Sequence, residues 1–406
     1  MRAPTPESDD DCQAAAAPAH PASRTARRLG LDLSPRTHVF GAFFLYAFSM
    51  GGFFPRLAEI QRALGVAEGP FGLALIGTAT GTLVSLTFAS RILERVGYRI
   101  ILVLIPLLAL LYALACSATD AGVLFLALIA PGLCIGAIEV IVNLEADRVE
   151  HLGGRLIMNR AHAFWSLGFF ASGTVGALMS QAGISPRAHL FMMVPVVLAG
   201  TVLVLGRFDP APRRAGGSAQ ASPAFARPTL GILVLVALTL SAMVMEGAGA
   251  DWSAIYMRDV FGSSHFVAGF AVAAGALAQG ITRYFADGLV QRYRPAPVAR
   301  AFLTVLGVGA ILVFAAPASA IALLGFGLMG VGTSVIFPLA MSAAAQRTDR
   351  PAAINVAALA QTSFVAFLLG PPLLGFVAEH MGIRWTFGIA LPLVAISFAA
   401  ARSLSR

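Results

Sequence analysis

Charged residues are scarce in this 406-residue sequence, and lysine is absent. Asp, Glu and Arg make up 12% of the chain, and all 28 basic residues are arginine. An ordinary soluble domain carries about 25% charged residues. A nucleotide-binding P-loop needs the lysine of G-x-x-x-x-G-K-S/T, so ATP-driven work by such a loop is excluded in this chain.

Cysteine and catalytic motifs are also in short supply. The three cysteines, Cys12, Cys116 and Cys134, form no C-x-x-C pair, which makes small buried apolar side chains the better interpretation. The sequence contains no H-E-x-x-H, no G-x-S-x-G and no Cys/His ligand cluster. We therefore predict neither an enzyme nor a metal or organic cofactor.

What the sequence has in abundance is apolar residues, at 58% of the chain with a mean hydropathy of +0.80. A soluble protein of this size needs a polar surface, whereas lipid removes that need. A membrane-spanning helix requires about 20 mostly apolar residues. The continuous runs differ from the alternating pattern of barrel strands and predict an all-α membrane protein.

Twelve such runs divide six and six around the longest internal polar stretch. We expect a disordered cytoplasmic tail at 1–36, a six-helix bundle at 37–206, a linker at 207–228 and a second six-helix bundle at 229–406. The tail lacks the apolar core and cleavage site of a secretory signal. The expected spans lie near 38–60, 71–92, 99–117, 121–145, 160–181, 188–206, 230–257, 266–290, 298–316, 320–343, 354–378 and 384–402.

The arginines are distributed unevenly between the two sides of the membrane that these spans define. The side that carries both termini holds 23 arginines, Arg283 among them, and the other side holds five. Cytoplasmic loops collect basic residues. We therefore expect a multi-pass protein of the cytoplasmic (inner) membrane with both termini in the cytoplasm.

The two halves repeat each other in loop chemistry. The loop after the second span places Glu94 before Arg95 and Arg99, and the loop after the eighth places Asp287 before Arg292. The two acids are 193 residues apart, close to the spacing of the first and seventh spans. The pattern favours two parallel repeats about an axis along the membrane normal.

The stretch Ser90-Arg-Ile-Leu-Glu-Arg-Val-Gly-Tyr-Arg99 resembles the motif G-x-x-x-D-R-x-G-R-R of the major facilitator superfamily. It departs from that motif at Ser90, Glu94 and Tyr98. Further stretches resemble the bacterial fucose-permease-like branch: Glu139 to Asn143, His162 to Gly168, Glu246 to Ser253, and Leu369 to Gly375.

The resemblance implies two six-helix bundles that rock about a central site, with cytoplasmic ion pairs holding one state closed. Charges in loops would equally satisfy the topology rule alone. The residues that the resemblance assigns to the closing network are Arg91, Glu94, Arg95, Arg99, Glu150, Arg155, Asp287 and Arg292.

Glu139 is the leading candidate for proton coupling. An ionised group in the hydrocarbon zone costs about 2.5–3.5 kcal/mol, so such a residue faces a cavity or a partner. Asn143 lies one turn further along and shares its face. The fucose permeases carry an acid in this helix, which implies a proton site here; a structural acid is the alternative. Their first helix carries another acid, which residues 39–57 lack, so fucose itself is not predicted.

Other polar groups within the spans are candidate substrate ligands, and each has a plainer alternative. Glu246, Asp251 and Trp252 could meet a sugar or a cation, or the indole could anchor the helix at the membrane interface. His162 could relay protons or bond a loop. Trp165 lies near it, at the start of the fifth span. The mid-span amides are Gln279 and Gln361, which could bind a polyhydroxy solute or a neighbouring helix.

Together these features predict a secondary active transporter of a small organic solute, sugar-like or otherwise polar, with the proton as coupling ion. Its expected partners are that solute and the lipid bilayer, without nucleic acid, and we expect a monomer. Proton-driven efflux of a drug or natural product is the alternative, although the fifth span lacks the Gly-Pro pair of antiporters. A membrane sensor is disfavoured because no signalling domain is evident.

Overall fold

The computed structural model describes residues 29–154, 157–212 and 226–405, without the side chains of 89–91, 94, 287, 352–353 and 405. Every regular element in these ranges is a helix. The first half contains α1 (Pro35–Gly51), η1 (Phe54–Arg56), α2 (Leu57–Leu64), α3 (Glu68–Val96), η2 (Tyr98–Ile100), α4 (Ile101–Ala115), α5 (Ala121–Gly153), α6 (Met158–Gln181) and α7 (Pro186–Leu205). The second half contains α8 (Leu230–Phe261), α9 (His265–Tyr293), α10 (Pro295–Phe314), α11 (Ser319–Thr333), α12 (Ile336–Ala345), α13 (Ala352–Met381), α14 (Trp385–Gly388), α15 (Ala390–Ala400) and η3 (Ala401–Ser405).

Twelve segments among the described residues are long and apolar enough to cross a membrane. Their bounds agree with the expected spans to within a few residues at most ends. The largest difference is α5, which continues past the expected end near 145 to Gly153. The predicted all-α fold of twelve membrane helices is confirmed.

Short polar residues start many of these helices. The side chains of Ser34, Asp120, Ser185, Thr229 and Ser264 each accept a hydrogen bond from a backbone N–H in the first turn of the helix that follows. Such caps satisfy donors that have no partner within the helix. They fix the first turn of each of these helices at a polar residue of the sequence.

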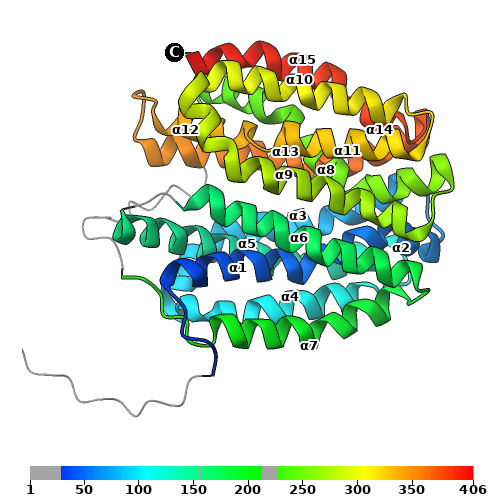
Figure 1. Ribbon diagram of the computed structural model, residues 1–406, viewed down its shortest axis with the longest axis horizontal. Helices are drawn as coiled ribbons and strands as arrows, with labels where there is room; N and C mark the ends of the chain where they lie inside the picture. Colours follow the sequence, from blue (N-terminus) through cyan, green and yellow to red (C-terminus); the bar gives the residue numbers. More distant parts are fainter. Residues whose placement is uncertain (1–28, 155–156, 213–225, 406) are drawn as a thin grey trace, which may run out of the picture.

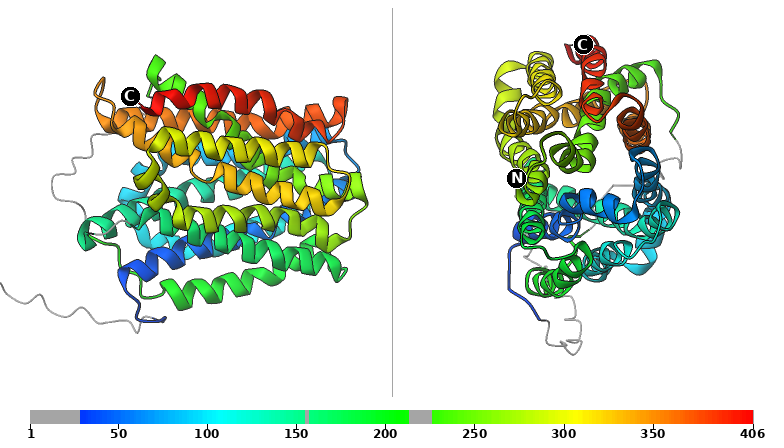
Figure 2. Two further views of the ribbon diagram at one scale, coloured as in Figure 1. Left: turned by 45° about the horizontal axis from the view of Figure 1, so that its top comes forward. Right: turned by 90° about the vertical axis from the view of Figure 1, so that its right-hand side faces the viewer.

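The helices form two groups that follow the two halves of the chain. In Figure 1 the first half, blue to green, lies below the second, green to red, and the end-on view of Figure 2 shows the same division. Two helix pairs join the halves along their length, α3 with α13 and α6 with α9. The broken first span, through η1 and α2, also touches α8.

The chain enters and leaves on the same face. Residues 29–34 and η3 lie at the left of Figure 1, together with the segments 207–212 and 226–229 and the loops near 154 and 350. We call this the terminal face, and the opposite one, with the loops near 66, 184, 263 and 383, the distal face. Much of the tail expected at 1–36 and of the linker expected at 207–228 falls outside the described residues.

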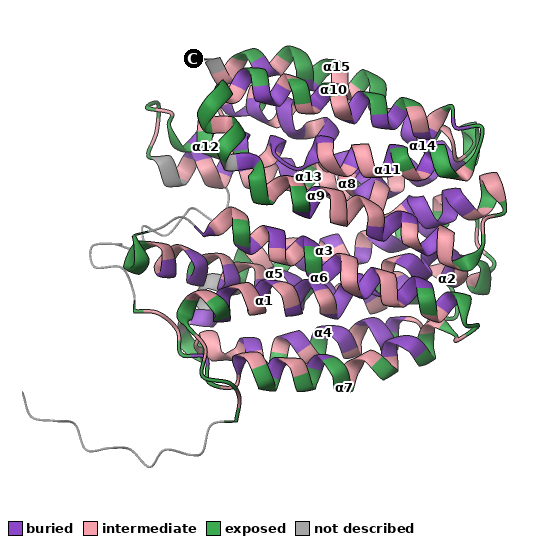
Figure 3. Cartoon of the chain, in the orientation of Figure 1, coloured by how far each residue is buried: buried purple, intermediate pink, exposed green. Residues whose placement is uncertain are grey.

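The outward side chains of the bundle are apolar. Val103 is 61% exposed, Leu126 65% and Leu324 55%, and exposed positions recur on the outer helices in Figure 3. Water would penalise such a surface, whereas lipid accommodates it. The surface therefore fits a bilayer around the bundle.

Two spans are interrupted inside the bundle. The first breaks after Gly51 into η1, and the tenth breaks between α11 and α12 at residues 334–335. Pro338 has no N–H, so the carbonyl of Ser334 has no partner four residues on. This break leaves a backbone acceptor available to a side chain from another helix.

Candidate functional site

Glu139 and Asn143 meet on one face of α5, as their spacing predicts. The amide Nδ2 of Asn143 donates to Oε1 of Glu139 at 3.0 Å and to the carbonyl oxygen of Glu139 at 2.9 Å. Both residues are partly exposed rather than enclosed in the core. The carboxylate therefore has a fixed partner and remains reachable from the interior of the bundle.

Two aromatic residues from neighbouring helices complete the surroundings of Glu139. Tyr46 on α1 lies close enough to Glu139 to interact with its carboxyl. The Tyr46 ring lies edge-on to Trp165 of α6, with centroids 6.3 Å apart, and Trp165 stacks on Phe169 at 5.3 Å. Tyr46 was not predicted, because a phenol within an apolar run gives no signal of its partner.

His162 lies on α6, one turn before Trp165. Its ring meets Phe43 of α1 edge-on, with centroids 5.0 Å apart. The guanidinium of Arg283 is near enough to act electrostatically on both His162 and Glu139. Two helices of the first half, α5 and α6, thus present polar groups toward one arginine of the second half.

Arg283 is the centre of the second half's contribution. Its Nη2 lies 3.6 Å from Oε1 of Glu246 on α8, and its side chain is 14% exposed. Its Nε donates to the carbonyl of Ser334 at 3.2 Å, the acceptor released by the break before α12. Its Nη1 lies 3.4 Å from Oγ of Ser166 on α6, so this side chain links the two halves.

The placement of Arg283 corrects the sequence interpretation. The arginine count assigned it to a cytoplasmic loop, whereas it lies within α9, which continues to Tyr293. The expected span 266–290 already contained residue 283, so the error lay in counting its charge with the loop that follows the span. A guanidinium held in the span by a carboxylate and a carbonyl satisfies its donors internally.

Gln279 sits one turn before Arg283 and is buried. Ser166 donates to its Oε1 at 3.5 Å, and its Nε2 donates to Thr333 of α11 at 3.4 Å. Its amide therefore bridges helices of both halves. The structure brings together Glu139, Asn143, His162, Trp165, Glu246 and Gln279 with the unpredicted Tyr46, Ser166, Arg283, Thr333 and Ser334. We call this set the central polar cluster.

The remaining predicted ligands lie elsewhere. Asp251 is partly exposed and acts electrostatically on Tyr112 of the first half. Trp252 is fully buried, and its Nε1 has no hydrogen-bond partner among the described residues. Gln361 accepts a hydrogen bond from the backbone N–H of Ala226 at 3.0 Å, which ties the end of the linker to α13.

The residues assigned to the closing network are dispersed. Arg99 pairs with Asp209 at 3.2 Å within the first half. Glu150 accepts from the N–H groups of Ile157 and Met158 at 2.6 and 3.1 Å, at the start of α6. Arg95 and Arg292 are exposed, and Arg292 lies 5.3 Å from the ring of Tyr293. The side chains of Arg91, Glu94 and Asp287, and all of Arg155, lie outside the described residues.

Polar contacts also join the halves at the distal face. Arg258 of α8 donates to the carbonyl of Ala58 at 2.5 Å and to Oε1 of Gln61 at 2.9 Å. The N–H of Gly69 donates to Oε2 of Glu379 at 3.1 Å. Three further residues extend this network at the α6–α9 end: Gln181, His265 and Phe266. We call these contacts the distal clasp.

Among the described residues, no group of three His, Cys, Asp or Glu side chains could hold a metal ion. The central polar cluster is instead a set of hydrogen-bonding and charged groups. It suits the binding of a polar organic molecule and the exchange of a proton at a carboxylate.

Comparison with known proteins reveals extended similarity. A family model described as Major Facilitator Superfamily matches residues 234–405. The chain is 31% identical over 373 residues to the uncharacterized transporter y4wD of Sinorhizobium fredii, covering 90% of this chain and 97% of that protein. It is 26% identical over 378 residues to an uncharacterized MFS-type transporter of Yersinia pestis, covering 90% and 94%.

Solved structures share the fold at lower identity. The fucose:proton symporter FucP of E. coli matches with a TM-score of 0.62 and 18% identity, covering 92% of this chain and 98% of that one. The nucleoside transporter NupG matches at 0.63 and 14%, covering 92% and 98%. A bacterial homolog of the human lysosomal transporter Spinster, in an inward-facing and occupied conformation, matches at 0.67 and 14%, covering 92% and 96%.

Proposed function

The chain belongs to the major facilitator superfamily of transporters, and we propose that it moves a small polar organic solute across the cytoplasmic membrane by alternating access, with the proton as coupling ion. The observation that carries this proposal is the central polar cluster. Charged groups inside a membrane bundle are energetically costly, so they are rare unless a function requires them. Here Glu139 of one half and the Arg283–Glu246 pair of the other stand near each other between helices.

The chemistry of the cluster supports a hydroxyl-bearing solute. Asn143 and Gln279 offer amides, and Trp165 offers an indole ring on which the apolar face of a sugar can stack. FucP is named as a fucose transporter and NupG as a nucleoside transporter. Both names fit the solute class that this set of side chains favours.

Glu139 is the proposed proton carrier. Its carboxyl accepts a hydrogen bond from Asn143 on α5, Tyr46 on α1 lies beside it, and the cationic Arg283 lies across from it in the second half. A proton moving down 100 mV supplies about 2.3 kcal/mol, and one pH unit supplies about 1.4 kcal/mol. Together they support a solute gradient of about 500-fold at one proton per solute.

The distal clasp supports access to the site from the terminal face, which the arginine distribution assigns to the cytoplasm. Contacts from Arg258 and Glu379 hold the halves together at the other end. Reversal would require these contacts to break and others to form between the terminal ends. We propose that both termini lie in the cytoplasm and that this conformation faces inward.

Efflux of an amphiphilic compound is the second candidate. The observation in its favour is the aromatic group beside Glu139, where Tyr46 meets Trp165 and Trp165 stacks on Phe169. Such a group would accept an apolar ring as readily as a sugar. The two candidates differ in the direction of the proton-driven gradient and in the polarity of the solute.

The test is uptake into proteoliposomes with a pH gradient imposed. We expect Glu139→Gln to remain folded, by its circular dichroism and gel-filtration profile, and to lose proton-driven accumulation. The control is Asp32→Asn, an exposed acid before α1, which should accumulate solute like the unaltered chain. Accumulation by Glu139→Gln that a protonophore still abolishes would overturn the assignment of Glu139.

A further inference from the structure

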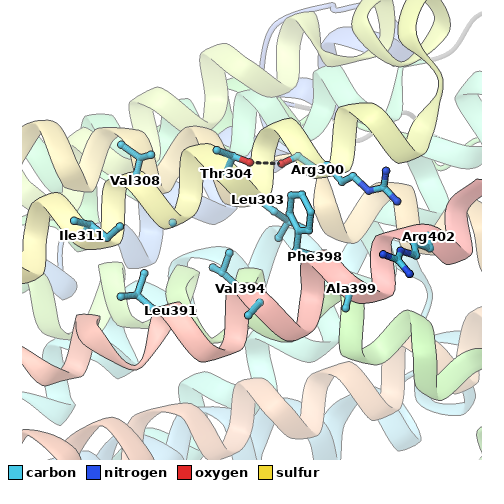
Figure 4. Close-up of a pocket in the computed structure, with 12 residues that line it drawn as sticks. Arg300, Leu303, Thr304, Val308, Ile311, Leu391, Val394, Phe398, Ala399 and Arg402 are labelled. Atoms are coloured by element: carbon cyan, nitrogen blue, oxygen red, sulfur yellow. Dashed lines mark hydrogen bonds between the residues drawn. The ribbon is translucent and has the colours of Figure 1, made fainter.

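A groove lies on the outside of the bundle, remote from the central polar cluster. Helices α10 and α15 diverge along a groove of about 740 Å³. Figure 4 shows the two helices that line it, with Leu303 and Ile311 on α10 and Leu391, Val394 and Phe398 on α15, and with Val308 at the edge of the lining. We call it the α10–α15 groove.

The walls of the α10–α15 groove are apolar and open to the outside. Val308 is 45% exposed, Ile311 47%, Leu391 38% and Phe398 41%. Gly307 lies between these side chains on α10 and lacks a side chain that would fill the space. In a bilayer, a groove of this kind faces hydrocarbon and accepts a flexible apolar chain.

One end of the groove carries two positive charges. Arg300 and Arg402 lie at the same end in Figure 4, at the terminal face. The guanidinium of Arg300 sits 5.9 Å from the centroid of the Phe398 ring. Its Nε is buried and has no hydrogen-bond partner among the described residues. A buried donor of a cationic side chain without a partner points to an acceptor that is absent from the chain itself.

We propose that the α10–α15 groove binds an anionic diacyl phospholipid, with an acyl chain between α10 and α15 and the phosphate at Arg300 and Arg402. Basic sites between membrane helices at the cytoplasmic side select anionic headgroups. The phosphate supplies oxygens that a guanidinium can bind through two N–H groups at once.

The length of the groove agrees with this occupant. Eleven residues separate Arg300 from Ile311, and a helix rises about 1.5 Å per residue, so the apolar stretch is about 16 Å long. Half the hydrocarbon thickness of a bilayer is about 15 Å. A lipid of one leaflet therefore places its phosphate at the arginines while its chain follows the groove toward the bilayer centre.

Native mass spectrometry on the purified full-length chain tests the proposal. The probes are phosphatidylglycerol and phosphatidylcholine with the same acyl chains, titrated separately. We expect retention of phosphatidylglycerol in preference to phosphatidylcholine. In Arg300→Gln/Arg402→Gln the preference should fall about 25-fold, since each arginine near the membrane surface strengthens anionic lipid binding about fivefold. The control Arg207→Gln/Arg227→Gln removes two exposed arginines at the two ends of the linker and should retain the preference.

A third variant tests the contribution of the groove independently of the two arginines. Val308→Trp keeps both arginines and fills the space between the helices, so we expect it to lose phosphatidylglycerol as well. Soluble glycerol phosphate should not displace the lipid. Equal binding of the two lipids, displacement by glycerol phosphate, or unchanged binding by both the double-arginine and Val308→Trp variants would overturn the proposal.

Discussion

Arg283 shows how one side chain can connect the chemistry of the two halves. Glu246 neutralises its charge, Ser334 accepts from its Nε, and Ser166 of the opposite half stands 3.4 Å from Nη1. The Ser334 carbonyl is free for this contact because Pro338 cannot donate to it. A proline in the tenth span thus contributes to holding an arginine of the eighth.

Substitution of Arg283 should reduce both stability and transport, and a second substitution should distinguish the two effects. Arg283→Gln leaves Glu246 without its cation, and we expect a loss of about 2 kcal/mol, between the values for exposed and buried pairs. Adding Glu246→Gln should restore much of the thermal stability but not the solute uptake. Equal uptake by the double variant and the unaltered chain would contradict a transport role for this pair.

Asp349, in the loop between α12 and α13, should give a pH-dependent contribution to stability. Hydrogen bonds from Arg347 and Asn355 lower the pKa of Asp349 to about 2. Its contribution is therefore complete above the unfolded value near 4 and is lost as the pH falls through about 2. We expect Asp349→Asn to lower the thermal midpoint in detergent at pH 7, with the difference shrinking between pH 4 and 2. A difference in thermal midpoint that grows as the pH falls from 4 to 2 would contradict the prediction.

Sequence spacing predicted the contact between Glu139 and Asn143 because both lie on one helix. It could not predict Tyr46 as their neighbour, since that contact depends on how α1 packs against α5. Trp252 illustrates the converse: the sequence places it beside an acid, and only packing shows that it is fully buried. Helical periodicity identifies residues that share a face but not the helix that the face meets.

At the scale of elements, α3 and α13 join the halves through glycine. A Cβ at Gly375 would lie 2.6 Å from the carbonyl oxygen of Glu68, and a Cβ at Gly72 would lie 2.5 Å from that of Pro371. Backbones this close leave no room for a side chain on either helix. The contact belongs to the distal half of both helices.

Alanine at Gly375 should therefore push α3 and α13 apart. We expect Gly375→Ala to cost about 1–3 kcal/mol, the range for overpacked sites, seen as a lower thermal midpoint. Gly370→Ala on the same helix is the matched control, because a Cβ there meets nothing within 4 Å. It should be neutral or slightly stabilising. Equal losses in both variants would contradict the close approach at Gly375 as the cause.

Hydropathy located the twelve spans, because uninterrupted apolar length is a strong signal. It did not predict the interruptions in the first and tenth spans, which are apolar on both sides of each break. Nor did it give the full length of α5 and α9, whose last turns are polar and project beyond the apolar runs. Arg283 was misplaced for a different reason: its charge was counted with the loop, although the expected span 266–290 contained it.

For the whole molecule, the distal clasp holds the conformation described above. Arg258 donates to two acceptors of the other half, Ala58 and Gln61. A hydrogen bond from a charged group contributes about 1.5–3 kcal/mol. The balance between the two faces therefore depends strongly on this one side chain.

Arg258→Gln should shift the protein toward a state that opens at the distal face. A loss of about 2 kcal/mol changes the equilibrium about 30-fold. Spin labels at Ala63 and Met381, in a background without the three cysteines, should report a longer distance population. Arg62→Gln, an exposed arginine one residue from Gln61, is the control and should leave the distances unchanged. A short distance in both variants would contradict the clasp.

The division into two halves was evident from the linker composition and the repeated acidic and basic residues. The conformation of the halves was not, because alternating states share one sequence and differ by small free energies. The contacts of Arg258 and Glu379 with the first half exist in this state, and no spacing pattern predicts them.

The most direct measurement is solute accumulation by proteoliposomes, with a panel of radiolabelled sugars, nucleosides and amphiphiles and with an imposed pH gradient. The account predicts that a polar solute accumulates only when the gradient is present, and that a protonophore or Glu139→Gln abolishes this accumulation. Accumulation of the same solute without a gradient, or gradient-driven movement of amphiphiles alone in the opposite direction, would contradict it.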